Sequence, residues 1–238
     1  MNIEIVGKSD IGKKRTTNED AFLIDVQAKF AIVADGVGGL QAGQIASQLA
    51  VREIQVYLQG QEITPEGLSA AVQKANRAIY EAGEADSGHS GMATTVNVVG
   101  FVQGKVHIAH VGDSRTYRYR KGTLEVITQD HNVKTFLAKG WISPEQIDDR
   151  ISQEALMRAL GMETACTVDL YSSELMPQDL WLTATDGLFG MVSHGRIEAI
   201  LAEHGTHLMQ AVEALIGEAN ANGGRDNSTV VIAYVHSL

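Results

Sequence analysis

Residues 30–43, FAIVADGVGGLQAG, join an apolar run to a cluster of glycines, and Asp35 stands where the two meet. The run FAIVA is typical of a buried strand. With residues 21–26 and the short polar turn 27–29, it predicts a hairpin that ends at Asp35. A nucleotide-binding loop would need Gly-Lys-Ser/Thr after its glycines, or the spacing G-x-G-x-x-G, and the glycines at positions 36, 38, 39 and 43 match neither. The sequence therefore argues against a phosphate-binding glycine loop here.

The overall charge excludes several classes of partner. Nineteen basic and 29 acidic residues among 238 give a net charge of -10, which leaves no basic surface for nucleic acid or a membrane and suggests a need for cations. No apolar run approaches the roughly 20 residues of a membrane span, so we expect no membrane insertion. The single cysteine, Cys166, cannot form an internal disulfide, and the first ten residues do not resemble a secretion signal. We expect a cytoplasmic protein.

In the rest of the chain, groups of residues with a strand pattern alternate with groups that have a helix pattern. Helical spacing of apolar residues predicts two helices over 46–58 and 65–82, the second capped by Thr64 and started by Pro65. Residues 92–128 predict four strands of one antiparallel meander. The remaining predicted elements are strands at 6–12, 180–185 and 228–235 and helices at 194–204 and 207–221. This order suits two packed sheets with a helix pair on each outer face, whereas residues 131–160 are polar and broken, with two short helices.

Carboxylates occur where four of these strands begin or end. Asp35, Asp113 and Asp186 follow apolar runs, and Asp226 precedes the last one. Carboxylates on such rigid supports are the hard oxygen ligands that Mg²⁺ and Mn²⁺ prefer. Any one Asp-Gly pair is more simply explained as a turn, but four together favour a metal site.

A further acidic cluster, Asn18-Glu19-Asp20, lies three residues after Arg15. An arginine beside metal-binding carboxylates can bind phosphate oxygens through its two-pronged guanidinium group. The alternative is an ordinary surface ion pair.

Six motifs, in order, carry a family resemblance: SDIGKKRTTNEDA, VADGVGGLQAG, SGMATTVNVV, VGDSR, TDGL and GRDNSTVVI. In order and approximate spacing they resemble the motifs of the metal-dependent protein phosphatases, the PPM family of type 2C enzymes, over about residues 3–235. The resemblance implies an α+β fold, a four-layer α-β-β-α sandwich with two central antiparallel sheets. It also implies a single phosphatase domain over residues 1–238, with a flap at about 131–160.

The resemblance further implies a site for two or three Mn²⁺ or Mg²⁺ ions. Asp35 would bridge two ions, one of which the carbonyl of Gly36 would also bind, while Arg15 would bind the phosphate. The other implied metal-site residues are Asp186 and Asp226 on the second ion, Glu19 and Asp20 through bound waters, and Asp113 with Asp186 on a third ion.

The implied activity is that of a bacterial protein serine/threonine phosphatase, in which a metal-activated water attacks phosphorus directly. Its partners would be phosphoprotein substrates, made by a Ser/Thr kinase in a signalling role. Two alternatives stay open: a catalytically idle phosphoprotein-binding module of the same fold, and a hydrolase of small phosphoesters. Cys166 lacks the arginine-containing phosphate loop of a cysteine phosphatase.

Val37 departs from the pattern of many eukaryotic members, which carry a histidine there as the proposed general acid. Bacterial relatives often have an apolar residue at this position, so we expect activity to be retained. A metal-bound water is our first candidate for the proton donor, and His131 is the second. The other histidines show no metal-ligand spacing, and we expect surface or capping roles for them.

Overall fold

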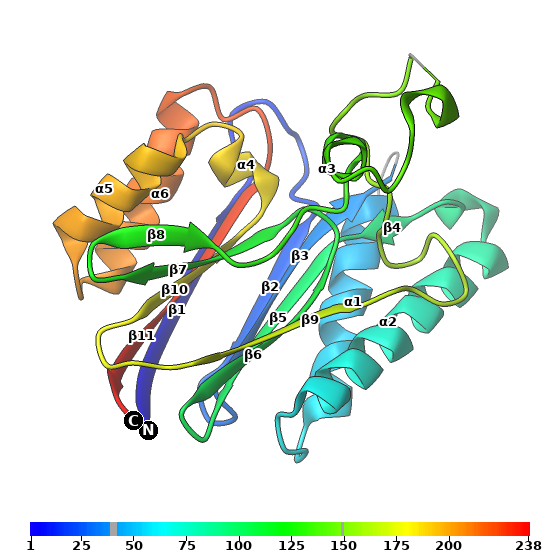
Figure 1. The fold of residues 1–238 in the computed structure, drawn as a ribbon. Helices are drawn as coiled ribbons and strands as arrows, with labels where there is room; N and C mark the ends of the chain where they lie inside the picture. Colours follow the sequence, from blue (N-terminus) through cyan, green and yellow to red (C-terminus); the bar gives the residue numbers. More distant parts are fainter. Residues whose placement is uncertain (39–41, 149) are drawn as a thin grey trace.

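The computed structural model of the chain describes residues 1–38, 42–148 and 150–238; residues 39–41, with Gly39 of the quoted stretch, and residue 149 lie outside this description. Two antiparallel sheets face each other, and each is covered by a pair of helices (Figure 1). The first sheet has the order β1 (Asn2–Asp10), β11 (Ser228–Ser237), β10 (Leu180–Ala184), β7 (Arg115–Arg120) and β8 (Thr123–Val126). The second has the order β2 (Asp20–Asp25), β3 (Phe30–Val37), β5 (Val96–Val102), β6 (Lys105–Val111) and β9 (Asp169–Glu174), with β4 (Ala93–Thr94) pairing with β3.

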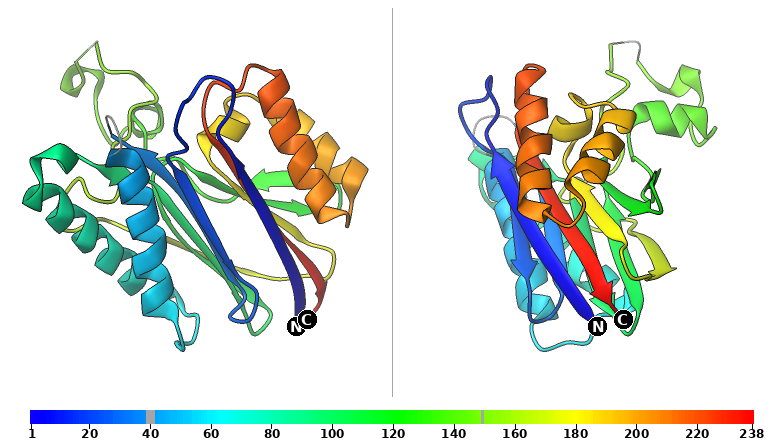
Figure 2. Two further views of the ribbon diagram at one scale, coloured as in Figure 1. Left: turned by 180° about the vertical axis from the view of Figure 1, so that it is seen from behind. Right: turned by 90° about the vertical axis from the view of Figure 1, so that its left-hand side faces the viewer.

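The helices form the two outer layers, which the rear view in Figure 2 (left) shows on opposite sides of the sheets. Helices α1 (Ala42–Leu58) and α2 (Pro65–Ala85) pack on the second sheet, and α5 (His194–His204) and α6 (Leu208–Ala221) pack on the first. Short helices complete the structure: η1 (Ser87–His89), α3 (Val133–Ala138), η2 (Pro144–Gln146) and α4 (Asp186–Phe189). The predicted α-β-β-α sandwich is therefore confirmed. In none of the described helices is there an apolar stretch that could cross a membrane.

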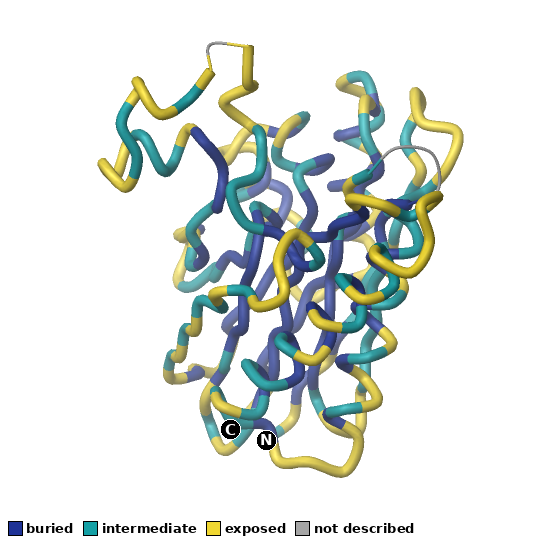
Figure 3. Tube along the Cα trace, turned by 90° about the vertical axis from the view of Figure 1, so that its right-hand side faces the viewer, coloured by how far each residue is buried: buried dark blue, intermediate teal, exposed yellow. Residues whose placement is uncertain are grey.

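Strand β3 shows why FAIVA is apolar at every position. Ile32 and Ala34 pack into the core under α1 and α2, while Ala31 and Val33 face the core between the sheets. Because both faces are covered, the strand is continuously buried, as the dark centre of Figure 3 shows for the sandwich as a whole. Burial on both faces fixes the strand that carries Asp35.

Local turn and cap chemistry agrees with the sequence predictions in several places. The Oγ1 atom of Thr64 accepts a hydrogen bond of 3.0 Å from the backbone N–H of Gly67 at the start of α2. Gln103-Gly104 and Lys121-Gly122 both have positive φ at each residue, as tight hairpin turns require. The predicted helices at 194–204 and 207–221 match α5 and α6 to within a residue.

The predicted four-strand meander is wrong. Strands β5 and β6 pair in the second sheet, but β7 and β8 belong to the first, so the chain changes sheets at residues 112–114. The reason is Gly112, whose φ of +108° turns the chain sharply against Thr95. The first strand also begins and ends earlier than predicted, and β9, an exposed edge strand, was not predicted.

Candidate metal and phosphate site

The hairpin of β2 and β3 places two carboxylates opposite each other. In the register of this antiparallel pair Asp20 lies directly across from Asp35. Like charges at such positions destabilise a sheet, so this pair needs compensation from its surroundings. Asp35 is fixed through its backbone: its N–H donates to Thr95 Oγ1 at 3.0 Å, and its carbonyl accepts from Thr95 N at 2.9 Å.

The change of sheets at Gly112 brings in a third carboxylate, Asp113. A side chain at residue 112 would place its Cβ 2.6 Å from Thr95 Cβ, so only glycine fits the turn. The adjoining Ser114 hydroxyl lies 2.7 Å from the Thr95 hydroxyl. Thr95 therefore ties the Asp113 turn to Asp35.

The first sheet supplies two more carboxylates, Asp186 after β10 and Asp226 before β11. Asp186 is the first residue of α4, and Gly187 behind it packs on the carbonyl of Asn227, where a Cβ would stand 1.8 Å from the oxygen. This close backbone contact holds the two carboxylate-bearing turns together.

The strand ends that carry these carboxylates lie at the end of the sandwich opposite the two chain termini (Figure 1). Asp35, Asp113, Asp186 and Asp226 line a cavity of about 500 Å³ there. Of the predicted site residues, the cavity wall includes Arg15, Glu19, Asp35, Gly36, Asp113, Asp186 and Asp226. Asp20 does not line the cavity; it is buried behind it, where its Oδ2 accepts hydrogen bonds from Thr185 Oγ1 at 2.9 Å and Thr229 Oγ1 at 2.7 Å. Both sheets contribute to the site, which therefore depends on their alignment.

Burial and mutual repulsion shift the carboxylates toward their protonated forms. Burial raises the pKa of Asp20 to about 7, with the hydroxyls of Thr229 and Thr185 opposing and the charges of Asp186 and Asp226 adding to the rise. Burial likewise raises the pKa of Asp113 to about 7, helped by Asp186 and Asp130. The pKa of Asp35 lies well above its ordinary value, from burial and from the surrounding aspartates. Such a cluster is stabilised by added positive charge.

The donor set fits hard divalent cations. The Oδ1 atom of Asp20 is buried and has no hydrogen-bond partner among the described residues, and Gly36 packs so tightly on Gly43 that only backbone fits there. Across residues 1–38, 42–148 and 150–238, no three His, Cys, Asp or Glu side chains are grouped so that they could hold one ion. An ion here would therefore need carbonyl or water ligands as well, which suits Mg²⁺ and Mn²⁺.

Arg15 is the cation that the structure places at this acidic cavity. Its Nη2 donates to Asp226 Oδ2 at 2.7 Å, and about half of its side chain is exposed. The guanidinium group thus keeps free donors at the cavity while one carboxylate orients it. This partly exposed ion pair, the alternative considered above, lies at the cavity, because both of its partners line it.

Asn227 was missed by sequence reasoning. Its Oδ1 accepts from the backbone N–H of Glu19 at 2.8 Å, and its Nδ2 donates to the carbonyls of Ile11 at 2.9 Å and Thr17 at 3.0 Å. This buried side chain joins the segment that carries Arg15 and Glu19 to the turn that carries Asp226. The available signal was its position directly after Asp226. Thr95, Thr185 and Thr229 were also missed.

His131, the second candidate for the proton donor, is not placed for that role. Its side chain is fully buried and does not line the cavity; its Nδ1 accepts from Gly112 N at 3.0 Å, and its Nε2 lies 3.1 Å from Asp169 Oδ2. Its carbonyl accepts hydrogen bonds from the N–H groups of Met157 and Arg158. His131 therefore links the Gly112 turn to the far end of the flap, residues 131–160, and is a structural residue. His110 is also buried, contrary to the expectation of a surface or capping role.

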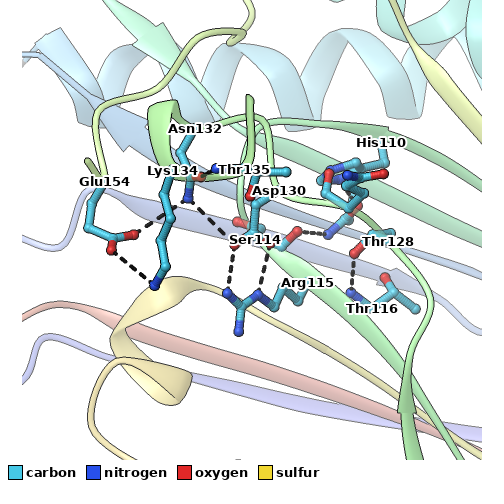
Figure 4. Close-up of polar contacts among 12 residues, drawn as sticks. His110, Ser114, Arg115, Thr116, Thr128, Asp130, Asn132, Lys134, Thr135 and Glu154 are labelled. Atoms are coloured by element: carbon cyan, nitrogen blue, oxygen red, sulfur yellow. Dashed lines mark hydrogen bonds and ion pairs between the residues drawn. The ribbon is translucent and has the colours of Figure 1, made fainter. Parts of the chain in front are cut away.

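Polar contacts also hold the base of the flap in place (Figure 4). Arg115 donates two hydrogen bonds to Asp130, at 2.8 and 2.6 Å, and its guanidinium carbon lies 4.0 Å from the centroid of the Phe189 ring. Lys134 and Glu154 form an ion pair of 3.7 Å across the flap. Because Glu154 also lines the cavity, the flap forms part of its wall.

The surroundings of Val37 and Cys166 agree with the expectation that neither side chain takes part in the chemistry. Val37 lines the cavity with 43% of its surface exposed, and it offers no proton. Burial raises the pKa of the Cys166 thiol to about 11, the opposite of an activated nucleophile.

Comparison with known proteins gives a consistent result. The family model described as protein phosphatase 2C matches residues 6–213. A serine/threonine phosphatase stp of Listeria innocua is 35% identical over 94% of this chain and 93% of its own. The catalytic domain of the phosphatase PstP, solved in complex with two manganese ions, is 33% identical, with a TM-score of 0.85 and 99% of each chain covered. Stp1 from Staphylococcus aureus superposes with a TM-score of 0.88 at 26% identity, covering 100% of this chain and 96% of that one.

Proposed function

The chain belongs to the protein phosphatase 2C family of PPM-type serine/threonine phosphatases, and we propose that it removes phosphate from phosphoserine and phosphothreonine in proteins by direct attack of water. The observation that carries the proposal is the convergence of Asp35, Asp113, Asp186 and Asp226, from two sheets, on a cavity that also holds Arg15. No side-chain nucleophile is needed for such a reaction.

The proposed ligand roles follow the position of each residue. Asp35 and the carbonyl of Gly36, with Asp186 and Asp226, would hold two ions that take water as further ligands. Glu19 and the buried Asp20 would act through such waters, and Asp113 with Asp186 would hold a third ion. When bound, Mn²⁺ or Mg²⁺ lowers the pKa of the attacking water and neutralises phosphoryl oxygens. The chain supports these roles with hard oxygen donors at the ends of well-buried strands.

The chain's own residues orient the substrate. Arg15, held by Asp226, directs its remaining N–H donors at phosphate oxygens. Val37 and the buried His131 leave no side-chain acid of the predicted kind at the leaving group, so we propose that water supplies that proton. A positioned acid is worth about 10²- to 10⁴-fold, so its absence lowers the rate on poor leaving groups most.

We further propose that residues 1–238 act as one phosphatase domain, with the flap beside the substrate entrance. The proposed setting is the cytoplasm, with substrates phosphorylated by a Ser/Thr kinase. The single Cys166 and the acidic surface are compatible with that setting.

The test is turnover of a phosphothreonine peptide with saturating Mn²⁺ by the Asp35→Asn and Asp226→Asn variants. Each should lose more than about a hundredfold in kcat, because changes even beyond the direct ligands of a metal cost 10- to 100-fold. Asp25→Asn, at the far end of the same hairpin, is the matched control and should retain activity.

Three results would contradict the proposal in different ways. Near wild-type turnover by either variant would remove the metal assignment. Peptide binding without phosphate release at saturating Mn²⁺ would favour the idle module. A much higher kcat/KM on small phosphoesters than on phosphopeptides would favour the small-phosphoester hydrolase.

A further inference from the structure

Three cavities meet at one side chain, that of Met162. The catalytic cavity of about 500 Å³ shares Asp113, Glu154 and Asp186 with a cavity of about 440 Å³ on the flap side. On the side of Met162 it has two further neighbours, one of about 230 Å³ lined by residues between 157 and 167 and one of about 300 Å³ between α2 and the segments at Gly91 and Gly161. The catalytic cavity shares Ala159 with the first neighbour and Gly91 with the second. Met162 lines all three. The site thus continues along the surface in two directions from this methionine.

The backbone that carries Met162 is fixed. Leu160 exchanges two backbone hydrogen bonds with Thr94, at 2.8 and 3.1 Å, and the N–H of Gly161 donates to Asn76 Oδ1 at 2.9 Å. Gly161 has a φ of +89°, and a Cβ there would lie 2.5 Å from the Ile79 side chain. The turn is therefore held against α2 and β4 and can take no side chain at residue 161.

The side chain of Met162 is nevertheless exposed, with 51% of its surface accessible. Its unbranched, polarisable chain adapts to differently shaped apolar partners, which is why methionine is frequent at surfaces that bind many partners. A flexible apolar side chain on a fixed turn, at the junction of three cavities, has the properties of a contact residue for a variable ligand.

We propose that Met162 and the two neighbouring cavities bind the substrate polypeptide on either side of the phosphorylated residue. The proposal rests on the function proposed above. A phosphorylated side chain in the catalytic cavity places its own backbone at the rim, and each flanking residue then advances by about 3.3 Å in an extended chain. Both neighbouring cavities adjoin the catalytic cavity at Met162, so flanking residues that pass this side chain meet them. Met162 is thereby a specificity-determining residue that favours extended segments with apolar side chains next to the phosphoserine or phosphothreonine.

The experiment compares two substrates with the Mn²⁺-loaded full chain. One is a ten-residue phosphothreonine peptide with leucine on each side of the phosphorylated residue; the other is p-nitrophenyl phosphate, which has no flanking residues. Met162→Ala should raise KM for the peptide about fivefold or more, the scale of losing a well-packed contact. Its kcat on the peptide and its kcat/KM on p-nitrophenyl phosphate should stay within about twofold of wild type. Met209 on α6, which is 44% exposed, provides the control: Met209→Ala should leave the kinetics on both substrates unchanged.

An unchanged peptide KM in Met162→Ala would overturn the inference. So would an equal loss on both substrates, because it would place Met162 in the reaction itself or in the stability of the fold. Retained activity on p-nitrophenyl phosphate shows that the variant is folded. Absence of turnover of either substrate by the wild-type chain would overturn the proposed function, and this inference with it.

Discussion

Asn227 makes three hydrogen bonds that no carboxylate of the site could replace. It satisfies the N–H of Glu19 and two carbonyls of residues 11–17 while itself only 2% exposed. Removing it takes away the partner of the Glu19 N–H and of the Ile11 and Thr17 carbonyls, and it frees the segment that positions Arg15. Asn227→Ala should lower the free energy of unfolding by about 2–3 kcal/mol and kcat/KM by about tenfold or more.

Urea denaturation and steady-state kinetics measure both effects. Asn222→Ala, which removes one hydrogen bond to the Met191 carbonyl on an exposed turn, is the control and should cost much less. Equal losses in the two variants would show that Asn227 has no special role in joining the two segments.

Among individual residues, the charged residues of the site could be predicted from the sequence, but the polar residues that position them could not. Asp35 and Asp226 stand out because they belong to a set of four carboxylates at the ends of apolar strands. Thr95, Thr185 and Asn227 are polar residues of common type, and their importance comes from contacts across about 20 to more than 200 residues of chain. One-dimensional patterns do not show such contacts.

The turn at Gly112 is the element on which the site most depends. Gly112→Ala would combine a φ of +108° with a Cβ 2.6 Å from the Thr95 side chain. We expect a loss of about 2–4 kcal/mol in the free energy of unfolding and reduced activity, because Asp113 and the Thr95–Asp35 contacts move together.

Gly104→Ala provides the matched comparison for Gly112→Ala. Gly104 also has positive φ, +77°, but nothing lies within 4 Å of its added Cβ, so only the backbone strain of about 1 kcal/mol applies. Thermal unfolding of both variants separates strain from crowding. A smaller effect at residue 112 than at residue 104 would contradict the assigned role of the turn.

The turn at Gly112 is also the point at which the assignment of strands to sheets could not be predicted from the sequence. The hairpin of β2 and β3 was predictable because its strands are adjacent in the sequence and the short turn at residues 26–29 fixes its register. The four strands over 92–128 follow one another through short turns, and their sequence pattern does not tell which sheet each joins. The edge strand β9, half exposed along its length, has too weak an apolar pattern to be predicted.

For the whole molecule, the raised pKa values predict how metal removal affects stability. Asp20 and Asp113 have pKa values of about 7 when folded, against an ordinary value of 3.8. The unfolded chain therefore releases these protons at lower pH, and the metal-free protein loses stability as pH rises from about 4 to about 7. Bound Mn²⁺ should offset that loss, because it compensates the ionised carboxylates.

Thermal unfolding at pH 5 and pH 8, in EDTA and in Mn²⁺, tests this dependence. We expect the metal-free melting temperature to fall by about 5 °C or more between the two values, and the gain from Mn²⁺ to be larger at pH 8. Asp25→Asn should behave as wild type. A metal-free melting temperature that rises with pH, or a gain from Mn²⁺ that is equal at both values, would contradict the pKa assignments.

The pairing of β1 with β11 also determines when the protein can fold during its synthesis. Residues 2–10 have their partners at 228–237, so the first sheet cannot close until the ribosome has made the last strand. Asp226 and Asn227 emerge just before that strand. A nascent chain therefore holds an unfinished site until residues 226–237 have been made, and contacts of high sequence separation then set the pace of folding.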